Sequence, residues 1–312
     1  MKCRVFDSHC DTAFELWYRK EHLNKNTCHI DLEKASAFSA YAQIFAFCSL
    51  SGCMENAPIT TQELLTLPLE NLRREVAANA DKVGFARNSA EVEALNQAGK
   101  MAILLSVEGP EVFDCDPARL EGLRKDGFAT MTLTWNADNA LAGWHRSDKG
   151  LTDAGRDFVR EAERCGILID VSHLAEAAFW DLVEMSTKPI LASHSNARVV
   201  WDHSRNLTDD QLRAIARCGG TVGLNLYAGF LGEDPDLETV RRHLDHMVEL
   251  CGEEHVTLGG DLDGCEELPR GFHDLRDYAC LRDYLLVHGY DAPLLEKLYY
   301  DNLMNLLKSG EV

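Results

Sequence analysis

The sequence has 312 residues, 46% of them hydrophobic, and a formal net charge of −20. An acidic surface repels phosphate backbones and anionic lipid, so we expect no nucleic-acid partner and no membrane partner. An anionic substrate would have to be captured by a few locally placed arginine or lysine residues.

The cysteines and the first residues indicate the cellular compartment. Eleven cysteines without a CxxC pair favour free thiols in a reducing environment. The opening segment MKCRVFDSHCD is too short and too soon polar for a signal peptide, and no apolar run reaches 18 residues. We therefore expect a soluble, cytoplasmic protein.

Short apolar runs alternate with longer amphipathic segments along the chain. Near-continuous apolar runs are typical of strands that are buried on both faces of a parallel sheet. The eight expected strands are residues 3–9, 41–49, 101–109, 128–136, 166–173, 188–196, 220–227 and 255–264. Helices are expected at residues 59–84, 151–166, 207–220 and 236–252, and Pro68 should break or kink the first of them.

Eight strands alternating with helices predict a (β/α)8 barrel, and a doubly wound open sheet is the structural alternative. The sequence contains no low-complexity segment and no linker rich in proline or glycine. We expect a single barrel domain over residues 1–312.

Ionisable residues follow several expected strands directly, at the barrel end where active sites lie. They are His9, Asp11, Glu108, His173, His194 and Asp261. Three imidazoles with two or three carboxylates suit Zn²⁺ best, with Mn²⁺ and Co²⁺ as further options. Because five ligands exceed the need of one tetrahedral zinc ion, Glu108 could bridge two ions about 3.5–4 Å apart that activate a water between them.

A carboxylate left over from the metal ligands would serve as the base. Asp261 is the first candidate for accepting the proton of the water, and Asp263, in the loop beyond the strand, is the second. In an extended chain, residues two apart point the same way, so His9 and Asp11 should converge while Cys10 faces the packing.

Arg205 lies in the segment HSRNLTDD, in the loop after the strand that carries His194. Its guanidinium could grip a substrate carboxylate with two hydrogen bonds. The alternative is an arginine at a helix entry that pairs with Asp209 or Asp210, and the residues alone leave both open. Eight other histidines, His243 among them, are expected at surface or capping positions.

Eight segments resemble the renal (membrane) dipeptidase family of the amidohydrolase superfamily, in the order of that family and over nearly the whole chain. They are DSHCDT (7–12), SVEGP (106–110), MTLTWN (131–136), GLTDAG (150–155), LIDVSH (168–173), ASHSNAR (192–198), SRNLTDD (204–210) and GGDLDG (259–264). The resemblance implies a (β/α)8 barrel with two zinc ions per chain.

The resemblance also implies a role for each matching residue. His9 and Asp11 would hold one ion, His173 and His194 the other, and Glu108 would bridge them. By the same likeness, Asp261 would transfer the proton and Arg205 would hold the C-terminal carboxylate of the substrate.

The chain departs from the family at Trp135, where mammalian members carry a histidine assigned to polarising the scissile carbonyl. We expect Trp135 and Asn136 to contact the substrate, with a zinc ion alone, Asn136 or His145 polarising the carbonyl. Mammalian members are also secreted and lipid-anchored, and we expect neither property for this chain, which has no hydrophobic tail up to residue 312.

The leading hypothesis is a zinc dipeptidase that hydrolyses small L-L or L-D dipeptides through a metal-bridging hydroxide. One alternative is an amidohydrolase-superfamily enzyme acting on another small amide, a lactone, an ester or a phosphotriester. The other is a catalytically silent metal-binding barrel that serves as a scaffold. Relatives often pair, so a homodimer is a further possibility.

The alternating direction of side chains along the first expected strand generates a prediction. Cys10→Ala should retain most of the bound metal and activity because its side chain faces the packing, whereas His9→Ala should lose both. Elemental analysis and a dipeptidase assay of the two variants measure this. Equal metal loss in both variants would contradict the assignment.

Overall fold

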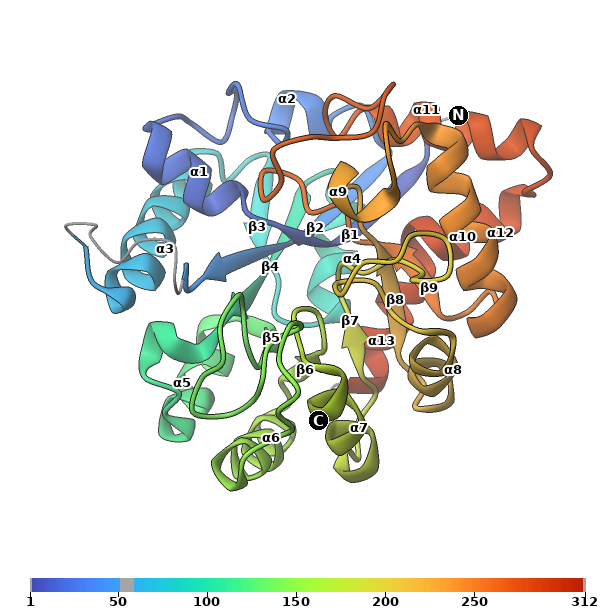
Figure 1. The fold of residues 1–312 in the computed structure, drawn as a ribbon. Helices are drawn as coiled ribbons and strands as arrows, with labels where there is room; N and C mark the ends of the chain where they lie inside the picture. Colours follow the sequence, from blue (N-terminus) through green and yellow to red (C-terminus); the bar gives the residue numbers. More distant parts are fainter. Residues whose placement is uncertain (1, 51–58, 311–312) are drawn as a thin grey trace.

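The computed structural model describes residues 2–50 and 59–310, which form a closed parallel β-barrel with helices around it (Figure 1). In this part of the chain, eight strands form the ring, which closes where β2 pairs with β4. These strands are β1 (Arg4–Cys10), β2 (Ala40–Cys48), β4 (Met101–Glu108), β5 (Phe128–Thr132), β6 (Leu168–Asp170), β7 (Leu191–Ala192), β8 (Thr221–Leu224) and β9 (Val256–Leu258). The predicted (β/α)8 barrel is confirmed.

A short strand, β3 (Val83–Phe85), lies outside the ring and pairs with the first residues of β4. The expected helix over residues 59–84 is therefore wrong at its end, because α3 spans Thr61–Ala78. Pro68 does not end this helix. Buried leucines on both sides of Pro68 pack the helix onto the barrel, and this packing outweighs the lost backbone hydrogen bond.

The other expected helices are confirmed to within three residues at each end. Thr152 and Thr208 cap α6 (Asp153–Cys165) and α8 (Asp209–Arg217), since each hydroxyl accepts a backbone N–H from the helix. The remaining helices are α1 (Thr12–Arg19), α2 (Leu32–Ala35), α4 (Ser89–Gln97), α5 (Leu120–Asp126), α7 (Glu176–Met185), α9 (Ala228–Leu231), α10 (Leu237–Cys251), α11 (Asp277–Val287), α12 (Ala292–Glu296) and α13 (Asn302–Gly310).

Two sets of side chains fill the molecule. The larger lies between the strands and the surrounding helices. The smaller lies inside the barrel, where Phe6, Ile44 and Leu104 pack with Leu303 and Leu307 of α13. This apolar filling leaves the carboxyl ends of the strands to polar side chains.

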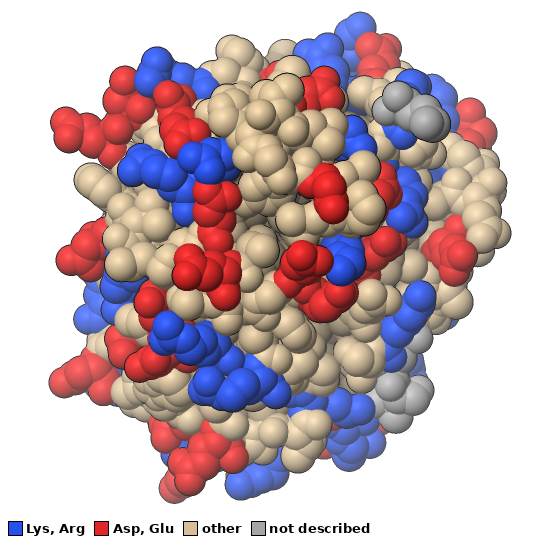
Figure 2. Space-filling view, turned by 90° about the vertical axis from the view of Figure 1, so that its right-hand side faces the viewer, with Lys and Arg blue, Asp and Glu red and all other residues tan. Residues whose placement is uncertain are grey.

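Acidic and basic side chains are interspersed over the face shown in Figure 2, with wide uncharged areas between them. On α10, for example, Arg241 contacts both Glu238 and Asp245. Such surface pairs contribute little to stability but leave no large area of one sign on this face. Within residues 2–50 and 59–310, no helix has the length and apolar character needed to cross a membrane.

His243 of α10 is fully buried, so its expected surface position is wrong. Its Nε2 lies 2.9 Å from the carbonyl oxygen of Leu231, and its Nδ1 accepts the N–H of Ala197 at 3.2 Å. The ring therefore joins the loop after β7 to the end of α9. Burial lowers its pKa to about 4, helped by the positive charges of Arg242 and His246.

The lowered pKa of His243 predicts a loss of stability in acid. Because the unfolded chain takes up this proton near pH 6.5 and the folded chain only near pH 4, stability is lost as the pH falls through that window. Between pH 7 and pH 4 the free energy of unfolding of the wild type should fall by about 3 kcal/mol more than that of His243→Gln. Denaturant titrations at each pH measure this, and the exposed His288→Gln should behave as the wild type. Parallel curves for the wild type and His243→Gln would contradict it.

Candidate active site

The predicted site residues lie at or just beyond the carboxyl ends of β1, β4, β6, β7 and β9, and the barrel brings them together. Glu108 is the last residue of β4, whereas His173 and Asp261 lie three residues beyond β6 and β9. His173 and Asp261 have φ values of 67° and 57°, in the left-handed region that such residues rarely adopt. Backbone strain of this kind is concentrated at functional sites.

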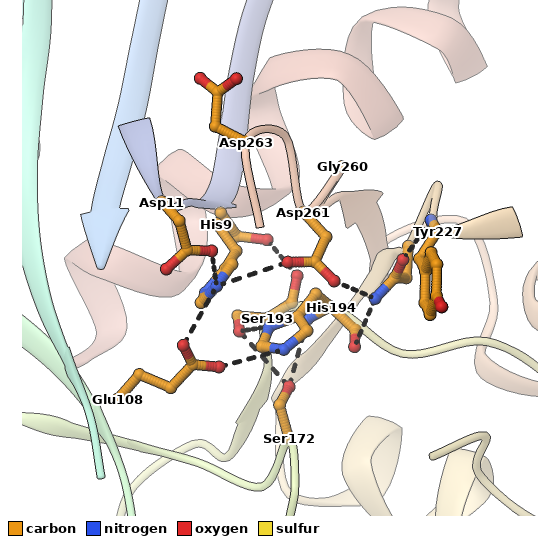
Figure 3. Close-up of polar contacts among 12 residues, drawn as sticks. His9, Asp11, Glu108, Ser172, Ser193, His194, Tyr227, Gly260, Asp261 and Asp263 are labelled. Atoms are coloured by element: carbon orange, nitrogen blue, oxygen red, sulfur yellow. Dashed lines mark hydrogen bonds and ion pairs between the residues drawn. The ribbon is translucent and has the colours of Figure 1, made fainter. Parts of the chain in front are cut away.

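The buried carboxylate of Glu108 lies between two groups of side chains (Figure 3). Its Oε1 is 3.0 Å from Nε2 of His173 and 3.4 Å from Nε2 of His194. Its Oε2 is 3.7 Å from Nε2 of His9, and the same nitrogen is 3.3 Å from Oδ2 of Asp11. Glu108 therefore has one oxygen facing each group.

The histidine nitrogens suit metal ligation. Nδ1 of His173 lies 3.0 Å from Oδ1 of Asn136, and Nδ1 of His194 lies 2.7 Å from Oγ of Ser193. Because an amide oxygen only accepts, Nδ1 of His173 carries the proton and its Nε2 keeps a lone pair. Nε2 of His9 is buried and has no hydrogen-bond partner in the described part of the chain. Imidazoles oriented in this way by their other nitrogen are typical of metal ligands.

The local charges also favour a cation. Burial lowers the pKa of His173 and that of His194 well below the usual value, so both rings are neutral. Burial also lowers the pKa of His9, but the negative charges of Glu108, Asp11 and Asp261 outweigh it and raise this pKa to about 10. A divalent ion would offset the same negative charge. Three overlapping sets of three side chains each bring their ligand atoms close enough together to hold such an ion.

Asp261 is buried beside these ligands, with Oδ1 3.8 Å from Nε2 of His9. Asn225 donates a hydrogen bond of 3.0 Å to its other oxygen, Oδ2. Burial raises the pKa of Asp261, which suits a group that exchanges protons. The second candidate base, Asp263, points away from this cluster (Figure 3), where it accepts hydrogen bonds from Thr12 and the backbone of His29.

Arg205 is buried and does not form the alternative ion pair, since Asp209 and Asp210 contact Arg213 instead. Its Nη2 donates a 3.4 Å hydrogen bond to the carbonyl oxygen of His194, and its Nε has no partner among the residues that the structure describes. Burial lowers the pKa of the guanidinium, an effect that nearby carboxylates oppose. A buried arginine without a carboxylate partner is suited to an anionic ligand.

A cavity of about 630 Å³ opens over the cluster. Trp135, Asn136, His145 and Arg205 all line it. The ring centres of Trp135 and His173 are 6.3 Å apart, and Oδ1 of Asn136 accepts the hydrogen bond from Nδ1 of His173 described above. Nδ1 of His145 lies 2.8 Å from Oγ of Ser204. All these residues therefore lie where a substrate could touch them.

Three buried polar residues that the sequence analysis did not single out hold this cluster. Asp7 accepts the backbone N–H groups of His9 and Gly260 at 2.9 and 3.0 Å, and it also contacts the hydroxyl of Tyr278. Ser193 and Asn225, described above, contact His194 and Asp261. Asn225 lies at the end of an expected strand, as the ionisable site residues do, and that position could have identified it.

The fold and the site define a class of protein, a barrel hydrolase that depends on metal ions at the carboxyl ends of its strands. A family model described as membrane dipeptidase, peptidase family M19, matches residues 1–312. The chain therefore belongs to this family, which confirms the predicted family and the predicted metallo-dipeptidase class.

Individual relatives agree with this assignment. A metallopeptidase structure from Rhodobacter sphaeroides, liganded with a phosphinate mimic of the dipeptide L-Ala-D-Ala, is 29% identical, with a TM-score of 0.91 over 99% of this chain and 100% of that one. An uncharacterized protein in the pqqA 5′ region of Klebsiella pneumoniae is 33% identical over 79% of this chain and 96% of its own length. Mouse dipeptidase 3 is 31% identical over 70% of this chain, and the match spans only 46% of the mouse protein.

The contact between Ser193 and His194 generates a prediction. Ser193→Ala removes the hydroxyl beside Nδ1 of His194, which frees the ring to rotate and should weaken metal binding about 10- to 100-fold. Competition with a chelator measures this. Ser186→Ala, which alters a serine that donates to Glu163 away from the site, is the control. Equal metal affinity in the two variants would show that Ser193 does not orient the ligand.

Proposed function

We propose that this chain is a zinc dipeptidase with two metal ions, held by His9 and Asp11 on one side and by His173 and His194 on the other. Glu108 would bridge the two ions, since one of its oxygens faces each pair. Two bound zinc ions would supply a Lewis acid for the scissile carbonyl and lower the pKa of the attacking water.

The residues around the metal ligands supply the rest of the reaction. Asp261 accepts the proton of the attacking water and delivers it to the nitrogen of the leaving amine, while Asn225 keeps its carboxylate in place. Arg205 holds the C-terminal carboxylate, and Trp135 and Asn136 contact the peptide from the cavity wall. Oδ1 of Asn136 already contacts His173, so bound zinc ions would supply the polarisation of the scissile carbonyl.

The cavity suits a small zwitterion. Its wall carries the carboxylates of Asp11, Glu15 and Glu266 together with the guanidinium groups of Arg146 and Arg205. A volume of about 630 Å³ lies within the range of small-molecule sites. The dipeptide mimic bound to the Rhodobacter sphaeroides relative supports the same class of substrate.

One observation carries this proposal above the others. Arg205 is buried, has no carboxylate partner among the described residues, and lines the same cavity as Glu108 and Asp261. A scaffold needs no proton acceptor, and a neutral ester or lactone offers no carboxylate to a buried guanidinium. The cytoplasmic location, the single domain and the possible homodimer stay predictions.

Dipeptide hydrolysis tests the proposal. The zinc-loaded protein should contain two ions per chain and hydrolyse L-L or L-D dipeptides. It should act on the same dipeptides with an amidated C-terminus at least about 100-fold more slowly in kcat/KM, because Arg205 would lose its charge-assisted contact. Elemental analysis and an amine-release assay measure both.

Asp261→Asn is the matched variant, since it keeps the shape and the contact with Asn225 but cannot accept a proton. It should retain two metal ions and lose at least about 100-fold in kcat. Turnover of lactones or phosphotriesters but of no dipeptide, with two metal ions bound, would overturn the assignment. Failure to bind metal would revive the scaffold alternative.

A further inference from the structure

A second cavity, of about 290 Å³, lies beside the first. The two share four lining residues, His145, Arg146, His173 and Arg205. The second cavity therefore begins where Arg205 would hold the C-terminal carboxylate of a substrate. It extends from there toward Ser195 and Arg198 in the loop after β7 and toward Glu176 at the start of α7.

The wall of this second cavity contains polar groups whose hydrogen bonds are incomplete. Ser195 and Arg205 are 1% and 3% exposed, and within residues 2–50 and 59–310 neither Oγ of Ser195 nor Nε of Arg205 has a hydrogen-bond partner. A buried donor without a partner costs about as much as a lost hydrogen bond, so such groups commonly mark a place that a polar ligand completes.

The charged side chains that line the second cavity favour an anionic ligand. Arg146 is exposed and forms no ion pair with any residue that the structure describes, and its guanidinium carbon lies 5.5 Å from the ring centre of Trp144. Arg198 contacts Glu176 at 3.2 Å, so the acidic residue of the wall is already neutralised there. Among the described residues of the wall, Arg146 and Arg205 are the two positive charges without an ion pair, and Asp148 is the remaining acid.

We propose that this second cavity is a subsite for the side-chain carboxylate of a C-terminal aspartate or glutamate, an inference that rests on the proposed dipeptidase function. With the α-carboxylate at Arg205, one or two methylene groups carry the second carboxylate into the neighbouring cavity, between Arg146 and Ser195. Such local arginines are what an anionic substrate needs to approach a chain of net charge −20.

Matched pairs of dipeptides test the subsite with the zinc-loaded protein. L-Ala-L-Glu and L-Ala-D-Glu are compared with L-Ala-L-Gln and L-Ala-D-Gln, which have the same shape without the charge. In at least one pair, kcat/KM should favour the acid about 10-fold or more, because a charge-assisted contact is worth about one order of magnitude. Calorimetric binding of the same dipeptides to Asp261→Asn should show the same preference.

Arg146→Ala should bring the ratio of kcat/KM for the acidic dipeptide to kcat/KM for the matching amide toward one. Because Arg146 is exposed, we expect this variant to fold normally. Arg119→Ala removes the same charge from an exposed position outside both cavities and should leave the ratio unchanged. A ratio near one in the wild type, with the amides hydrolysed, would overturn the subsite and leave the dipeptidase function intact. If no dipeptide is hydrolysed, the proposed function fails, and the calorimetric ratio then decides on the subsite alone.

Discussion

One buried carboxylate, that of Glu108, faces imidazoles from three different strand ends with its two oxygens. Its position follows from the closure of the barrel. β2 and β4 pair along seven residues, up to Cys48 and Glu108, and this long pairing fixes the carboxyl end of β4 against its neighbours. Burial raises the pKa of Glu108 to about 8 and the positive charge of His9 opposes this shift, so the ionised carboxylate depends on positive charge beside it. The geometry of the candidate metal ligands therefore depends on the closure of the barrel.

Buried polar side chains behind the cluster orient its members. Ser193 and Asn225 contact His194 and Asp261, and Asp7 holds the backbone on both sides of the junction between β1 and β9. None of these groups exchanges a proton with a substrate in the proposed reaction. They act by restricting the side chains that do, which is how supporting hydrogen bonds tune metal sites in general.

The sequence predicted the ring of strands and the clustering of six ionisable residues because both follow from periodicity and from the known polarity of barrels. It overestimated strand length, as at residues 188–196, where only Leu191–Ala192 is a strand, because the loop beyond is also buried. It missed β3, since three residues give no periodic pattern. His243 was wrongly expected at the surface and Asp7 was not singled out, because burial of a polar side chain depends on tertiary partners far away in the chain.

The site has a negatively charged side and a positively charged side, and the pKa shifts of two histidines differ accordingly. The pKa of His9 is raised to about 10 by three carboxylates, whereas burial and the charges of Arg205 and Arg146 lower that of His145 to about 3. A series of neighbouring histidine rings, His194 and His173, connects His9 to His145. In the low dielectric of a closed site, such a gradient orients a zwitterion, with its ammonium toward the carboxylates and its carboxylate toward the guanidinium groups. In the proposed complex, a dipeptide held in this way would place its peptide bond over the candidate metal ligands around Glu108.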